Sequence, residues 1–154
     1  MNLENLNFHD LVETRFFLEV EIVKMAAKRR TIDDIIALTN ALNTFEKKVA
    51  KGARATEENI MFNLKIADAA KNTTLKSLIL IITTKLLQHY NDNAQKIRLY
   101  RIDNSNFLLE KNQLVLDHII NQESYLATQI IKEHFKRNQY NRTIIRPSFF
   151  HCFN

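Results

Sequence analysis

Five polar side chains stand at positions where the helical periodicity of the sequence predicts apolar ones. Each falls at the centre of an apolar stripe, at about 100° per residue, and together they come from four separate predicted helices. A charged or hydrogen-bonding group at such a position must be paired or must face a cavity, because burial without a partner is costly. The pattern therefore predicts an internal, ligand-sized polar cavity. The five residues are Arg15, Asn59, Asn63, Asn112 and His134.

Composition limits the elements that can position these side chains. The chain has 154 residues, which fits one domain, and it contains only one Gly and one Pro. Because so little of the sequence favours strands and tight turns, we predict an all-α fold, an antiparallel bundle of six to seven helices. The bundle is expected to occupy residues 1–140, and residues 141–154 are expected to form a C-terminal tail.

Capping residues and hydrophobic periodicity predict where the helices begin and end. Thr31, with two acidic residues in the turn after it, is a predicted N-cap, and Gly52 fits the position just after the end of the same helix. Asn72 begins a second capping cluster. The periodicity predicts helices over 8–30, from 32 toward 51, from about 56, over a segment that includes 75–87, over 107–120, and from 124 to about 139, with a turn at 103–105.

The segment from Leu75 to Leu87 is apolar on nearly all sides. A helix of this kind belongs at the centre of a bundle or at a subunit interface. Its most apolar run, Leu78 to Ile82, is much too short to cross a membrane. We therefore expect no membrane partner, and we expect the chain to form a homodimer.

Charge, cysteine content and motifs exclude several classes of function. The net charge of +5 comes from Lys and Arg spread over most segments among acidic residues, which is typical of solvated helix faces rather than of a nucleic-acid-binding stripe. The single cysteine, Cys152, predicts a reducing, cytoplasmic setting. No phosphate-binding loop or nucleophile–base arrangement is present, and no histidine has a Glu three residues before it, as a di-iron bundle enzyme requires. We predict no catalytic residues and no enzymatic activity.

Each of the five polar positions also has a simpler explanation. Glu19 lies one turn after Arg15, so the two could form a buried ion pair without any ligand. In a chain rich in asparagine, some amides fall inward by chance and bond to backbone or water. A buried histidine such as His134 is as often a satisfied core residue as a ligand. The convergence of all five residues favours ligand contact, while these alternatives stay open.

Four parts of the chain form an ordered series of motifs. They are Asp10–Glu19 with Ala26–Ala27, Asn59–Asn63 with Ala67–Asn72, Asn112–Ile119, and His134. In this order they resemble the FCD (FadR C-terminal) domain, the effector-binding half of many GntR-type bacterial transcription regulators. The resemblance extends roughly from Asp10 to Gln139 and depends on the order of several weak motifs.

The resemblance implies a ligand site that this sequence has altered. Metal-binding members of the family hold a divalent cation with one aspartate and three histidines, and the cation captures a small carboxylate together with the arginine of the first helix. The residues at these places are Asn59, Asn63, Asn112 and His134, with Arg15 as the arginine. Because neutral amides are poor ligands for zinc, a divalent metal is disfavoured and we predict no cofactor. The amides and the imidazole are expected to bind the effector, and Arg15 is expected to pair with its anionic group.

The resemblance also implies a role. Regulators of this type carry an N-terminal winged-helix DNA-binding domain, whereas only residues 1–8 precede the first predicted helix, so we expect no direct DNA binding by this chain. It would be an excised domain, a separately encoded sensor or the product of a degraded gene. The implied function is effector sensing and dimerisation, with a small-molecule carboxylate bound in the bundle core. The alternative is a protein-association module or a remnant regulator domain that no longer binds a ligand.

Overall fold

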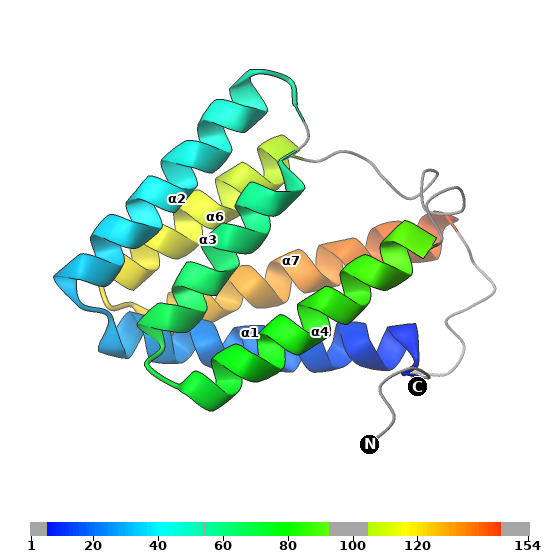
Figure 1. Cartoon of the computed structure of the whole chain (residues 1–154), viewed down its shortest axis with the longest axis horizontal. Coiled ribbons are helices and arrows are strands. Elements are labelled where there is room, and N and C mark those ends of the chain that lie inside the picture. The colour runs from blue at the N-terminus through cyan, green and yellow to red at the C-terminus, as the bar shows by residue number, and fades with distance from the viewer. Residues whose placement is uncertain (1–5, 54, 93–104, 146–154) are drawn as a thin grey trace.

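The computed structural model describes residues 6–53, 55–92 and 105–145, and almost all of them are helical (Figure 1). No strand occurs within these ranges. The predicted all-α fold is confirmed. The helices are α1 (Phe8–Arg29), α2 (Ile32–Ala50), α3 (Thr56–Ala69), α4 (Thr73–Asp92), α6 (Ser105–Ile120) and α7 (Ser124–Ile145).

The predicted capping residues begin and end the helices as expected. Thr31 and Asp34 form a capping box, in which the Thr31 N–H donates to the Asp34 carboxylate at 2.7 Å and the Asp34 N–H donates to the Thr31 hydroxyl at 3.2 Å. Gly52 has a φ of 66°, the left-handed conformation that glycine adopts most easily after a helix. The Asn72 side chain accepts a hydrogen bond of 3.0 Å from the Leu75 N–H at the start of α4. These local signals fix both ends of α2 and the start of α4.

Helix α1 is the element that joins the rest of the bundle, because it contacts α3, α4, α6 and α7. In Figure 1, α1 runs antiparallel to both α4 and α7 across the lower half of the molecule, and α2 runs antiparallel to α3 and α6 in the upper half. The C-terminal half of α1 packs into the apolar core through Val23, Ala26 and Ala27, and the large core side chains Phe45 and Phe62 are also fully buried. The earlier turns of α1 line a second region of the bundle, separate from this apolar core.

Two arginines at the end of α1 bind the C-terminal ends of other helices. Arg29 donates to the Ala70 carbonyl at 3.1 Å, just beyond α3. Arg30 donates to the carbonyls of Ile119 and Ile120, at 3.3 and 2.7 Å, at the end of α6. Carbonyls at a helix C-terminus lack intrahelical partners, so a cation at this place satisfies them and also interacts favourably with the helix dipole. These bonds hold α6 in place against α1.

Helix α4 lies at the edge of the bundle, so the prediction that it is at the centre is wrong. Ile79 and Leu86 are buried on its inner face, but Leu78, Leu80 and Ile81 are 43%, 45% and 44% exposed. The alternative prediction, a subunit interface, is consistent with this position. Among the described residues, no helix is long and apolar enough to span a membrane.

Helix α7 extends further than the periodicity predicts. It continues through Ile145, past the expected end at about Gln139 and into the segment assigned to the tail. Polar residues hide the apolar period here, but no helix breaker occurs before Pro147. The division at residue 140 stays a prediction. The rest of the predicted tail, with Cys152, and most of the predicted turn at 103–105 lie outside the described residues.

The contacts of Arg30 generate a test of how the bundle is held together. Arg30→Ala should lower the free energy of unfolding by about 1–3 kcal/mol, because two carbonyls at the end of α6 lose a charged hydrogen-bond donor. Urea denaturation measures the change. The matched control is Lys28→Ala, which alters an exposed cation in the last turn of the same helix and should shift the value by less than about 0.5 kcal/mol. Equal stabilities for the two variants would contradict this role.

Candidate functional site

A cavity of about 210 Å³ lies where α1, α3, α4, α6 and α7 meet. Four of the five predicted residues line it, namely Arg15, Asn59, Asn63 and His134. The positions singled out by the helical periodicity therefore share one cavity, while their contact with a ligand stays a prediction. The other residues around it are Val12, Phe16, Glu19, Leu86, Leu108, Lys111, Ile131 and Phe135.

The fifth predicted residue, Asn112, lies behind the wall of the cavity. Its side chain is fully buried, and its Nδ2 donates to the Asn59 Oδ1 at 2.8 Å. This bond occupies the acceptor of Asn59 and leaves the Asn59 amide nitrogen, a donor, as the group that can serve a ligand. The Asn112 Oδ1 is buried and has no hydrogen-bond partner among the described residues. Asn112 is therefore placed to orient Asn59 rather than to touch a ligand.

Arg15 and Glu19 form the ion pair that is the simpler explanation of Arg15. The Arg15 Nε lies 2.6 Å from the Glu19 Oε1, and both side chains are about three-quarters buried. Burial alone would raise the pKa of the Glu19 carboxyl, but the charges of Arg15 and Lys111 outweigh it and lower the pKa below its usual value. The pair thus stays ionised inside the bundle. Because both residues also line the cavity, pairing and ligand contact are compatible.

Lys111 is the residue that the sequence analysis missed. Its side chain is only 8% exposed and lines the cavity. Burial lowers the pKa of the Lys111 ammonium to about 8, with Glu19 opposing the shift and Arg15 adding to it. A usable signal was present, since Lys111 follows Leu108 by three residues and precedes Val115 by four, on the same helix face. A lysine at a stripe position usually extends to solvent, and for that reason it attracts no attention.

The charges around the cavity do not cancel. Among the described residues that line it, Arg15 and Lys111 are cationic and Glu19 is the one acid. Burial and the nearby Lys111 charge lower the pKa of His134 to about 4, so its imidazole is neutral near pH 7. The lining therefore carries one uncompensated positive charge at neutral pH.

Stacking fixes the orientation of the His134 ring. The ring lies nearly parallel to Phe107, with centroids 5.3 Å apart, and the Arg137 guanidinium carbon is 4.2 Å from the Phe107 centroid. The next residue, Phe135, stacks on Phe16 with ring centroids 4.1 Å apart. These aromatic contacts hold a neutral imidazole, which can donate one hydrogen bond and accept another, at the edge of the cavity.

The residues present do not fit the divalent cation that the family implies. Three of the four family ligand positions hold amides, at Asn59, Asn63 and Asn112, and a single imidazole remains at His134. Within residues 6–53, 55–92 and 105–145, no three His, Cys, Asp or Glu side chains are close enough together to bind a metal. The Lys111 ammonium also disfavours a second cation in the same space.

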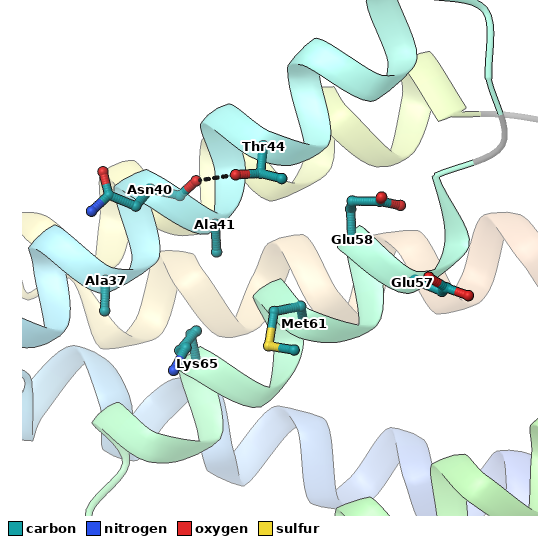
Figure 2. Close-up of a pocket in the computed structure, with 8 residues that line it drawn as sticks. All are labelled: Ala37, Asn40, Ala41, Thr44, Glu57, Glu58, Met61 and Lys65. Carbon is teal, nitrogen blue, oxygen red and sulfur yellow. Dashed lines mark hydrogen bonds between the residues drawn. The ribbon is translucent and has the colours of Figure 1, made fainter.

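A larger hollow of about 470 Å³ lies on the surface between α2 and α3. Figure 2 shows Ala37 and Ala41 on one side and Met61 on the other, with Glu57, Glu58 and Lys65 near the rim. The Thr44 hydroxyl donates to the Asn40 carbonyl of its own helix at 2.9 Å, and Met61 is 51% exposed. This is an open groove without converging polar groups, and none of the predicted site residues lies in it.

Comparisons with known proteins identify the family of this chain. The chain matches the FCD domain over residues 10–137, so it belongs to the FCD domain family. It is also 31% identical over 90 residues to the HTH-type transcriptional regulator LutR of Bacillus subtilis (strain 168). That match covers 58% of this chain and 41% of the regulator, so the chain corresponds to less than half of the relative's length. The relative is, by its name, a transcriptional regulator.

His134 predicts a pH-dependent loss of stability. Its pKa is about 4 in the folded protein, against an ordinary 6.5, so the unfolded chain binds more protons between these values. The free energy of unfolding should therefore fall as the pH drops from about 6.5 to about 4. His134→Gln should remove this pH dependence of the free energy of unfolding, whereas substitution of the exposed His9 by Gln should leave it unchanged. Urea denaturation at a series of pH values measures the slopes, and identical curves for wild type and His134→Gln would refute the assignment.

Proposed function

We propose that the cavity of this GntR-type effector-binding domain binds a small carboxylate, and that the domain dimerises. The observation that carries the proposal is a cavity, partly open to solvent, that has one excess positive charge and is lined by side chains from five helices. Such a site suits an anion, because desolvated cations and hydrogen-bond donors bind a carboxylate more strongly in the interior than in water.

The polar lining supplies the groups that such a ligand needs. Arg15 and Lys111 provide positive charge, and the amide of Asn63 and the orientated amide nitrogen of Asn59 provide further donors. His134 contributes a neutral imidazole, and Asn112 acts indirectly by holding Asn59. The simpler explanation of Arg15, its ion pair with Glu19, is then part of the site, because the carboxylate of Glu19 keeps the guanidinium in place.

The size of the cavity restricts the ligand. A volume of about 210 Å³ is below the range of roughly 300–1,000 Å³ that drug-sized ligands occupy. Small organic acids fit this space, and an acyl-CoA compound does not. The apolar part of the lining, with Phe16, Leu108 and Ile131, favours an effector with a short hydrocarbon portion.

Ligand binding at this place acts on helix packing. The cavity walls belong to α1, α3, α4, α6 and α7, so an occupant that binds one arrangement of these helices better than another shifts the population toward it. In a longer regulator, this shift would change the spacing of attached DNA-binding domains.

The outer face of α4 supports a dimer. Leu78, Leu80 and Ile81 expose large aliphatic side chains on one part of a helix that covers the edge of the bundle. This face also supports the second candidate function, a protein-association module that binds no ligand. The two candidates differ in whether the cavity admits a small molecule.

A thermal-unfolding screen tests carboxylate binding. We expect one or more small organic acids, in the presence of EDTA, to raise the unfolding temperature, since a ligand at ~100 times its dissociation constant adds about 2.7 kcal/mol. Arg15→Ala should reduce the rise in unfolding temperature that the ligand causes. The control is Lys28→Ala, which removes an exposed cation from the same helix and should keep the rise. No shift with any acid, in a protein that unfolds cooperatively, would favour the association module.

Sedimentation velocity tests the dimer. Leu78→Glu combined with Ile81→Glu should convert a dimer into a folded monomer, because two carboxylates would be buried at the interface. Asn43→Glu, at an exposed position of α2, is the matched control and should remain dimeric. A dimer that persists in the α4 double variant would place the interface elsewhere.

A further inference from the structure

The cavity contains a cation that the family's metal-binding pattern does not require. Amides replace three of the four metal-ligand positions, so the positive charge of a metal is missing, yet the Lys111 ammonium lies in the same space. The following inference rests on the proposed function, because it concerns how the same cavity holds its carboxylate.

Lys111 is buried without a charge partner of its own. More than nine-tenths of its surface is covered, and among the described residues no carboxylate lies within ion-pair distance of its Nζ. The one acid of the cavity, Glu19, already bonds to Arg15 at 2.6 Å. A buried ammonium in this situation costs stability, so the cavity is electrostatically incomplete until an anion enters.

The helices around Lys111 present few groups that could compensate its charge. Helix α1 presents Arg15 and Glu19, α3 presents the amides of Asn59 and Asn63, and α7 presents His134. The α4 contribution is the apolar Leu86. One anionic charge balances this set, because the lining has two cations and one acid. A second anionic charge would leave the set net negative and would lie near the Glu19 carboxylate.

We propose that the cavity selects a small monocarboxylate and that the Lys111 ammonium, not a bound metal ion, supplies the positive charge that holds it. The ligand carboxylate pairs with Lys111, the donors of Asn59 and Asn63 orient it, and its short carbon chain contacts the apolar lining. Binding is independent of divalent metals.

Proton linkage follows from the position of Lys111. Burial lowers the pKa of this ammonium to about 8, and a bound anion raises it again. Binding above about pH 8 therefore takes up a proton, and the affinity should fall by roughly tenfold for each further pH unit. In this range the Glu19 carboxyl, whose pKa is lowered, stays ionised, and the His134 imidazole stays neutral.

The test is isothermal titration calorimetry of the full chain in EDTA with three four-carbon probes. Butyrate carries one negative charge, butyramide none and succinate two. We expect butyrate to bind with a pH dependence that begins near pH 8, and butyramide and succinate to bind at least about tenfold more weakly. Lys111→Met should weaken butyrate binding by roughly tenfold or more, and Lys111→Arg should retain binding without the pH dependence, because guanidinium does not titrate here. Circular dichroism verifies that both variants are folded.

The outcomes separate this inference from the function on which it rests. If butyrate binds Lys111→Met as well as wild type, or binds only after zinc is added, the role of Lys111 is wrong but carboxylate sensing stands. If succinate binds more tightly than butyrate, the monocarboxylate selectivity is wrong. If none of the probes gives a heat of binding at tens of millimolar, and the Lys111 Cε resonance titrates identically with and without them, the inference about Lys111 fails. The thermal-unfolding screen with other acids then decides carboxylate sensing.

Discussion

A buried ammonium whose nearest carboxylate is already paired is the constraint on which the site depends. Lys111 lines a cavity in the bundle, and Glu19, the acid that could neutralise it, bonds to Arg15. A chain could avoid this cost with an apolar residue, so the arrangement is understandable only if something anionic completes it. The neutral His134, the family's altered metal positions and the small volume are all consistent with the same incomplete cavity.

The bundle holds this strained arrangement by combining two regions along the same helices. The last turns of α1 enter the apolar core through Val23, Ala26 and Ala27, while Arg15 and Glu19, earlier in the same helix, line the cavity. Helix α6 is divided in the same way, with Val115 and Ile119 fully buried and Lys111 one to two turns before them. The free energy gained by apolar burial at one end of each helix can therefore offset the cost of burying charged side chains at the other end. Coupling of this kind is what a sensor needs, because an occupant of the cavity acts on helices that the core keeps together.

Much of the fold is predictable from the sequence because its signals are local. Thr31, Gly52 and Asn72 act within one turn of their own positions, and each begins or ends a helix as expected. Four of the polar residues on the apolar stripes line one cavity, since a stripe must face the interior whatever the tertiary arrangement. The end of α7 was missed because its last turns are too polar to show a period and contain no helix breaker.

The remaining features depend on tertiary contacts that no local pattern encodes. Whether Asn112 touches a ligand or a neighbouring amide depends on the distance between α3 and α6, and the structure shows the amide of Asn59 at 2.8 Å. Lys111 was overlooked because a lysine on a helix stripe normally reaches water, and only the packing of α1 and α7 around it prevents this. The edge position of α4 also depends on tertiary contacts, since this helix packs mainly against α1 and α3. The composition of α4 alone would suit a core helix equally well.

The most direct test of this account is the free energy of unfolding of Lys111→Met, compared with wild type from pH 6 to pH 10.5 without ligand. In the folded protein the pKa of Lys111 is about 8, below its ordinary 10.5, so the cost of the buried charge is fully present below pH 8 and disappears as the pH rises to 10.5. We predict that Lys111→Met is more stable than wild type by up to about 3 kcal/mol below pH 8, with the difference vanishing toward pH 10.5. A variant that is less stable than wild type at neutral pH would show that the ammonium is already compensated, and it would contradict an electrostatically incomplete cavity.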